Sequence, residues 1–191
     1  MREERYCVID VETTGFSPAA DRVVEIGCAE VYGDQIVARW STLVNPGRAI
    51  PAEATAIHGI TDTMVACAPS LKAALKHARR LCRGRIVAAH SARFDLSFVG
   101  PSLAAQALCT MRLARAVFPE APNHKNQTLR RFLDIDGRAG ESFSIHRALG
   151  DALVTAHILI ACRSRYAALR GGKAWKKFVK ENALVVCCSR G

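Results

Sequence analysis

The chain lacks several features that would place it in common protein classes. No apolar run reaches the roughly 18 residues that a membrane-spanning helix needs, because the longest, Ala152 to Cys162, is shorter and contains Thr155 and His157. The N-terminal residues Met1–Arg5 are charged and lead directly into a predicted strand, without the long apolar region of a secretory signal. The Gly-Gly-Lys sequence at 171–173 lacks the spacing of a phosphate-binding Walker loop. No Ser/His/Asp hydrolase signature, internal repeat or low-complexity tract is present.

The eight cysteines form no recognisable framework. They include no Cys-x-x-Cys pair and no spacing typical of zinc ligands. Most lie among apolar residues, where a thiol behaves as a small hydrophobic group. We therefore expect reduced thiols and a cytoplasmic protein that does not interact with membranes. The cysteines are Cys7, Cys28, Cys67, Cys82, Cys109, Cys162, Cys187 and Cys188.

The composition predicts a globular protein with a basic end. The chain has 191 residues, half of them hydrophobic, which is enough for one well-packed domain with a small appendage. The formal net charge is +10, and residues 163–191 hold eight basic residues and one acidic residue. A basic balance favours polyanionic partners, nucleic acid first and anionic surfaces second. A solvated basic tail without a partner is the alternative.

The hydrophobic pattern predicts an α/β fold. Three strands come first, the second and third joined by a tight turn at Gly33-Asp34, which indicates a hairpin. Short strands and helices alternate afterwards, so the pattern predicts a mixed sheet covered by helices. The predicted strands are Arg5–Asp10, Arg22–Tyr32, Gln35–Val44, Arg85–Ala89 and Leu108–Met111. The predicted helices are Pro69–Leu81, Asp95 to about Val99 (ended by Gly100-Pro101), Arg112–Phe118, Gln127–Leu133 and a long one that follows His146 and reaches Arg165.

Two acidic residues lie where the first strand ends. Asp10 and Glu12 follow the apolar residues at 6–9. Residues i and i+2 of a strand point to the same face, so these two carboxylates lie close together and oppose each other's ionisation. Such a pair is kept where a cation compensates it or where water screens it at an ordinary strand end.

Two more acidic segments point to a metal site. Asp95 follows a buried strand and opens a helix, and Asp151 lies in the first two turns of the long helix, just after His146. If these carboxylates converge with Asp10 and Glu12, they form an all-oxygen site of the kind that suits Mg²⁺ or Mn²⁺. Two such ions about 4 Å apart can clamp the attacking and leaving oxygens of a phosphoryl displacement. His146 is then available as the general base that deprotonates the attacking water.

The order and the amino-acid sequences of these segments resemble those of the DEDDh-type 3′→5′ exonucleases. The matching motifs are DVETTG (10–15), HSARFD (90–95) and HRALGD (146–151), with IHGIT (57–61) in the interval where that family carries a similar stretch. The motif sequences are similar to those of the proofreading epsilon subunits of bacterial DNA polymerase III. The resemblance covers residues 5 to about 165. Two positions depart from it, Ser91 where the family often has Asn and Cys109 where it often has Asp, and neither removes a metal ligand.

The resemblance implies a ribonuclease H-like fold with a five-stranded mixed sheet, and a role for each matching residue. Asp10, Glu12 and Asp151 are expected to hold two divalent ions, with Asp10 bridging both. Asp95 is expected to act mainly on the second ion, and His146 as the base. The substrate-binding residues implied are Thr13, Glu53 and His58, which are expected to contact the terminal nucleotide.

The implied reaction is the release of nucleoside 5′-monophosphates from a 3′ end, in proofreading or repair. DNA is the preferred substrate because the motif sequences most resemble those of the DNA proofreading group. An exoribonuclease is the alternative, since RNA-degrading relatives share the same four carboxylates. A non-catalytic subunit that binds nucleic acid or a polymerase is the third hypothesis, and the five filled catalytic positions argue against it. A DNA polymerase or another replication or repair protein is the further partner that the resemblance implies.

The last part of the chain is predicted to be a basic extension. We assign residues 1–165 to the exonuclease domain and 166–191 to the extension. A helical arrangement of 173–180 puts Trp175, Phe178 and Val179 on one face and the lysines mostly elsewhere. The aromatic face is expected to dock on the domain or on a partner protein. The lysines are expected to contribute to DNA affinity.

Overall fold

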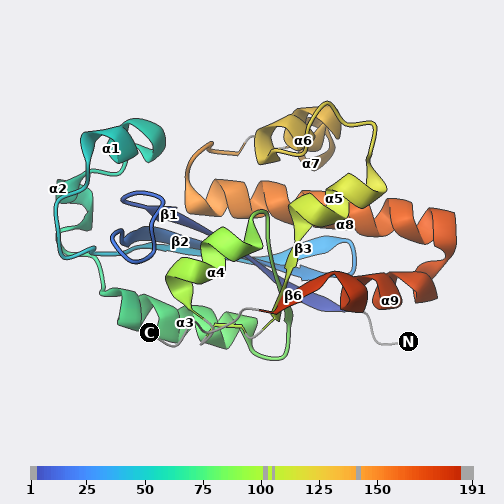
Figure 1. Ribbon diagram of the computed structural model, residues 1–191, viewed down its shortest axis with the longest axis horizontal. Coiled ribbons are helices and arrows are strands. Elements are labelled where there is room, and N and C mark those ends of the chain that lie inside the picture. Colours follow the sequence, from blue (N-terminus) through green and yellow to red (C-terminus); the bar gives the residue numbers. More distant parts are fainter. Residues whose placement is uncertain (1–3, 101–102, 105, 141–142, 186–191) are drawn as a thin grey trace.

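The computed structural model describes residues 4–100, 103–104, 106–140 and 143–185. Its centre is a mixed sheet (Figure 1), and the strand order is β3-β2-β1-β4-β5-β6. The strands are β1 (Arg5–Thr13), β2 (Val23–Tyr32), β3 (Gln35–Leu43), β4 (Ile86–Ala89), β5 (Gln106–Cys109) and β6 (Ala183–Val185). The first five are those expected from the sequence, with boundaries shifted by a few residues. The sixth was not predicted and comes from the C-terminal segment.

The pairing of the strands explains why the sheet is mixed. β1 pairs antiparallel with β2 on one side and parallel with β4 on the other. β4 and β5 are parallel, whereas β6 is antiparallel to β5. The predicted β2–β3 hairpin is present, and its turn residue Gly33 has a φ of 62°, a conformation that glycine adopts without a Cβ penalty.

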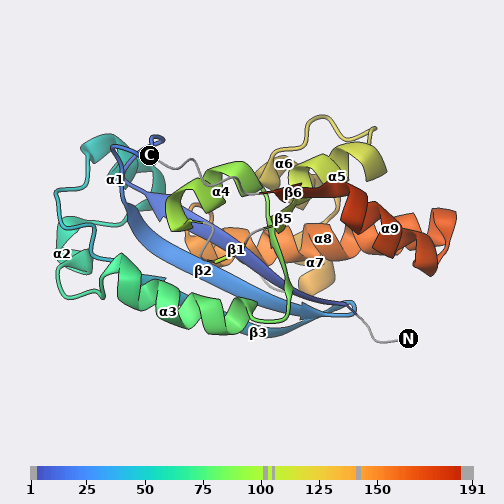
Figure 2. The ribbon, with the colours of Figure 1, turned by 60° about the horizontal axis from the view of Figure 1, so that its bottom comes forward.

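Helices cover both faces of the sheet (Figures 1 and 2). Alternate residues of β1 belong to two different cores, as period-two geometry requires. Tyr6 and Val8 pack with residues of the long helix α8 (Ala148–Arg170), while Cys7 and Ile9 pack with those of α3 (Leu71–Cys82) and α4 (Ala92–Val99). The remaining helices are α1 (Ala52–His58), α2 (Asp62–Val65), α5 (Thr110–Val117), α6 (Asn126–Phe132), α7 (Ile135–Ala139) and α9 (Gly172–Asn182).

The C-terminal segment packs against the rest of the fold. Trp175 and Val179 of α9 are buried, and the indole Nε1 of Trp175 donates a hydrogen bond of 2.8 Å to the hydroxyl of Tyr6. The docking of the aromatic face on the domain is thus observed, and the four α9 lysines are exposed. The proposed domain boundary at 165/166 falls inside α8, and the division itself stays a prediction.

Two further expectations can be compared with the structure. The cysteines among the described residues carry free thiols, and Cys187, Cys188 and Pro101 lie outside those residues. Over the described parts of the chain, no helix combines the length and the apolar character needed to cross a bilayer.

Candidate active site

Three carboxylates converge at the end of β1. Asp10 and Glu12 lie on this strand, and Asp151 lies in the first turn of α8. Each offers an oxygen within 4.8 Å of the others; Asp10 and Glu12 are partly exposed, whereas Asp151 is 9% exposed. The carboxylates therefore line a site that an ion from solvent can reach. An all-oxygen donor set of this size fits a hard divalent cation.

Asp95 lies behind this group. It is buried in the first turn of α4, and its carboxylate is next to the backbone of Val11 and of Ser91, whose hydrogen bonds favour the ionised form. Its charge is, after burial, the largest cause of the raised pKa of Asp10. The structure therefore brings Asp95 close to Asp10 but leaves it outside the three-carboxylate group among the described residues.

The electrostatics of the site favour a bound cation. Burial, followed by the charges of neighbouring acids, raises the pKa of Asp10 well above its usual range and that of Glu12 to about 8. Burial also raises the pKa of Asp95 to about 7 and that of Asp151. Carboxyl groups that resist ionisation because they repel one another gain most from a divalent ion placed between them.

His146 stands at the rim of the site. It is exposed, lies on the segment just before α8, and has a φ of 54°, which is uncommon for a residue other than glycine. Its backbone N–H donates to Oδ2 of Asp151 at 2.9 Å. The imidazole is thus attached to a fixed backbone next to a carboxylate while its ring remains accessible to water.

The predicted nucleotide-contacting residues differ in their placement. His58, the last residue of α1, is buried, and its Nδ1 accepts a hydrogen bond of 3.0 Å from the backbone of Ile60. Its Nε2 is buried and has no hydrogen-bond partner among the described residues. Burial lowers the pKa of His58, and the backbone of Thr13, which lies near the ring without making a hydrogen bond of normal geometry to Nε2, partly offsets this. The Thr13 hydroxyl itself donates to the Gly15 carbonyl. Glu53 is exposed in the first turn of α1, about one and a half turns from His58.

Three residues that the sequence did not single out support the site. Gln127 Nε2 donates to Oδ1 of Asp151 at 2.8 Å. Glu25 on β2 lies directly opposite Glu12 and binds Arg147, the residue after His146. Gln127 follows an Asn/His/Lys-rich loop and is not part of any sequence motif. Glu25 and Arg147 are 122 residues apart in the sequence, although their side chains are in contact. No local pattern could have paired them.

Comparison with known proteins agrees with this geometry. The profile of the RNase T family, described as exonuclease, matches residues 7–159. The chain is 33% identical over 168 residues to a DNA polymerase III PolC-type protein of Bacillus cereus, covering 84% of this chain and 11% of that protein. It is 36% identical over 165 residues to a DNA polymerase III subunit epsilon-like protein of Rhodobacter capsulatus, covering 81% and 23%. The chain thus spans about a tenth to a quarter of the length of these relatives.

A solved structure is similar over nearly its whole length. It is that of Exonuclease X in complex with 5′ overhanging duplex DNA, with 32% identity and a TM-score of 0.69. The match covers 83% of this chain and 91% of that one.

Proposed function

We propose that this chain, which belongs to the RNase T family of DEDDh-type exonucleases, removes nucleoside 5′-monophosphates from the 3′ ends of DNA by metal-dependent hydrolysis. One observation carries the proposal. Asp10, Glu12 and Asp151 come from two separate elements and meet within 4.8 Å, directly beside an accessible histidine. Acidic groups that raise one another's pKa are costly to bring together unless a cation binds them.

The proposed site uses four carboxylates for metal and one histidine for proton transfer. Asp10, Glu12 and Asp151 would hold two ions, Mg²⁺ or Mn²⁺, and Asp95 would support the second. When bound, such ions stabilise charge on the attacking and leaving oxygens of a phosphodiester. His146 would accept a proton from water through a ring nitrogen. The oxygen of that water then bonds to phosphorus as the P–O3′ bond breaks.

The terminal nucleotide would lie between the end of β1 and α1. His58 supports this placement because its Nδ1 is an acceptor, which puts the ring proton of the neutral imidazole on Nε2. A buried N–H donor without a partner costs free energy. A hydroxyl or phosphate oxygen of a bound nucleotide would remove that cost. Thr13, beside His58, would contact the same nucleotide, and exposed Glu53 would contact it from the rim.

DNA is the substrate that the comparisons favour. The 32% identical structure was solved with duplex DNA, and the relatives named above are DNA polymerase III proteins. A DNA polymerase or another replication or repair protein is the protein partner that we propose, with proofreading or repair as the role. The cytoplasmic location expected from the sequence stays a prediction.

A degradation assay tests the proposal. Oligonucleotides labelled at the 5′ end, as single-stranded DNA, mismatched duplex DNA and RNA, are incubated with Mg²⁺, Mn²⁺ or chelator. We expect stepwise shortening of DNA from the 3′ end with either metal, and none with chelator or with Asp10→Asn. Faster shortening of RNA than of matched DNA would assign the chain to the exoribonucleases. No shortening of any substrate by folded, metal-loaded protein would refute the catalytic proposal.

A further inference from the structure

An ion pair between a buried glutamate and a partly exposed arginine connects the central sheet to the segment that carries His146. Glu25 on β2 is only 3% exposed. Its Oε2 accepts from Nε of Arg147 at 3.0 Å, and its Oε1 accepts from Nη2 at 2.7 Å. Oε2 also accepts from the backbone N–H of Ala148 at 2.9 Å. Three donors from two consecutive residues therefore converge on one carboxylate, and a bidentate arginine contact of this kind fixes orientation as well as distance.

Glu25 lies at a costly position. It is directly opposite Glu12 in the β1–β2 register, where two like charges destabilise a sheet. Its charge raises the pKa of Glu12, whereas that of Arg147 lowers it. Glu25 is outside the group that could hold a metal among the described residues, and its oxygens are occupied by the Arg147–Ala148 donors. Glu25 thus repels Glu12 and offers no free oxygen to a metal ion. Its presence at this position therefore needs another physical explanation.

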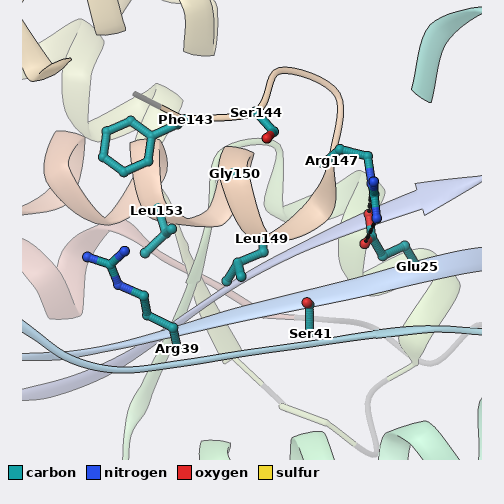
Figure 3. A pocket seen from close by; sticks show the side chains of 9 residues that line it. All are labelled: Glu25, Arg39, Ser41, Phe143, Ser144, Arg147, Leu149, Gly150 and Leu153. Carbon is teal, nitrogen blue, oxygen red and sulfur yellow. Dashed lines mark hydrogen bonds and ion pairs between the residues drawn. The ribbon is translucent and has the colours of Figure 1, made fainter. Parts of the chain in front are cut away.

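The surroundings show what the ion pair holds. The first turn of α8 rests on β2 so closely that a Cβ on Gly27 would lie 2.3 Å from the backbone of Ala148. Beside this contact is a cavity of about 300 Å³, lined by Leu149 and Leu153 of α8 and by Arg39 and Ser41 of β3. Figure 3 shows Glu25 and Arg147 at one end of this hollow. Packing on that side of the helix is thus incomplete, and the ion pair supplies a fixed attachment.

We infer that Glu25 and Arg147 are positioning residues, which set the place of His146 and Asp151 relative to Asp10 and Glu12. Arg147 directly follows His146, and Asp151 accepts the His146 N–H, so a shift of Arg147 moves both groups. Neither residue of the pair is assigned a contact with the reacting atoms. This inference rests on the proposed function.

The chain contains a matched control. Glu30 lies on the same strand and pairs with Arg85 at 2.6 Å, with both side chains largely buried. It faces Cys7, five residues before Glu12 in the register of β1, at the opposite end from the carboxylate cluster. Glu30→Gln therefore removes another largely buried ion pair from the same sheet without touching the site.

The experiment is a double-mutant cycle in kcat, measured at saturating DNA and metal with Glu25→Gln, Arg147→Gln and the double variant. Partners that orient metal ligands typically contribute 10- to 100-fold. We expect Glu25→Gln to lower kcat at least about 10-fold with KM little changed, and the double variant to lose far less than the product of the single losses. Glu30→Gln should leave kcat within about twofold.

Two results would overturn the inference. The first is an equal and small effect of Glu25→Gln and Glu30→Gln on kcat, with comparable losses of melting temperature, since the pair would then be purely structural. The second is independent, multiplicative effects of the two changes. Mn²⁺ titration of the same variants adds a readout that does not require turnover, and Glu25→Gln should weaken Mn²⁺ binding several-fold where Glu30→Gln does not. Inactive wild-type protein would instead refute the proposed exonuclease, and the Mn²⁺ titration alone would then decide the positioning role.

Discussion

The metal-free site should destabilise the fold at neutral and high pH, and Glu12→Gln measures by how much. Glu12 has a pKa of about 8 against a usual value of 4.5. The folded protein therefore holds a proton that the unfolded chain releases. For an acid whose pKa is raised by folding, stability falls as the pH rises from the pKa of the unfolded chain to that of the folded protein, and it levels off above the latter. A glutamine side chain at position 12 carries no charge at any pH and would be free of this penalty.

The magnitude follows from the two pKa values. Each pH unit between them corresponds to about 1.4 kcal/mol, which gives an upper limit of about 5 kcal/mol at pH 9. The gain in stability is smaller than this limit because Asp10 and Asp151 are subject to the same repulsion. When Glu12 is replaced, one of these neighbouring carboxyls ionises more readily in its place. We therefore expect Glu12→Gln to stabilise the metal-free protein by about 2 kcal/mol at pH 9, or by roughly 4–8 °C in Tm for a chain of this size. At pH 5 the gain should fall below about 1 kcal/mol.

Thermal unfolding in chelator at pH 5, 7 and 9 tests this prediction. Glu181→Gln is the control, because Glu181 is exposed and its ion pair with Lys177 spans 3.8 Å, a distance at which such pairs contribute little. Adding Mn²⁺ should reverse the order at pH 7, since a ligand that binds only the folded state stabilises it and wild type keeps the full ligand set. A Tm difference between Glu12→Gln and wild type that is the same at pH 5 and pH 9 would refute the electrostatic reasoning.

Two further predictions concern the C-terminal segment. Trp175→Ala should destabilise the protein by about 3–5 kcal/mol, as other buried Trp truncations do. Trp175→Phe should destabilise it by less, since this change removes chiefly the hydrogen bond to Tyr6. Urea unfolding measures both losses, and equal small losses would mean that α9 contributes little to the fold. Replacing the four exposed α9 lysines with Gln should weaken DNA binding and reduce its dependence on salt concentration. Replacing four exposed basic residues of α3 with Gln should not. Equal salt dependence for the two variants would contradict a specific contribution of α9 to DNA affinity. The α9 residues are Lys173, Lys176, Lys177 and Lys180, and the α3 residues are Lys72, Lys76, Arg79 and Arg80.

Local geometry made much of this fold predictable. Period-two alternation on β1 is enough to bring Asp10 and Glu12 to one face, and the structure places their oxygens within 4.8 Å of each other. The β2–β3 hairpin followed from a two-residue turn containing Gly33. The docking face of α9 followed from the helical spacing of Trp175 and Val179, both of which are buried. In each case the residues that carry the signal lie within a few positions of one another.

What the sequence missed depends on contacts between distant segments. Strand β6 is three residues long and exists because α9 docks and returns the chain to β5. Helix α1 has seven residues, follows Pro51, and buries only Ala54 and His58, so no periodic pattern marked it.

Glu25 is the most instructive omission. In the sequence it is one of two acids in a largely apolar strand, and nothing near it indicates a partner. Its partner lies 122 residues away, beside the proposed general base. Sequence motifs thus identified the groups proposed to act on the substrate, whereas the residues that orient those groups became visible only in the folded structure. Substitutions at Glu25 and Glu30 therefore test whether orientation, and not the presence of the catalytic groups alone, sets the rate.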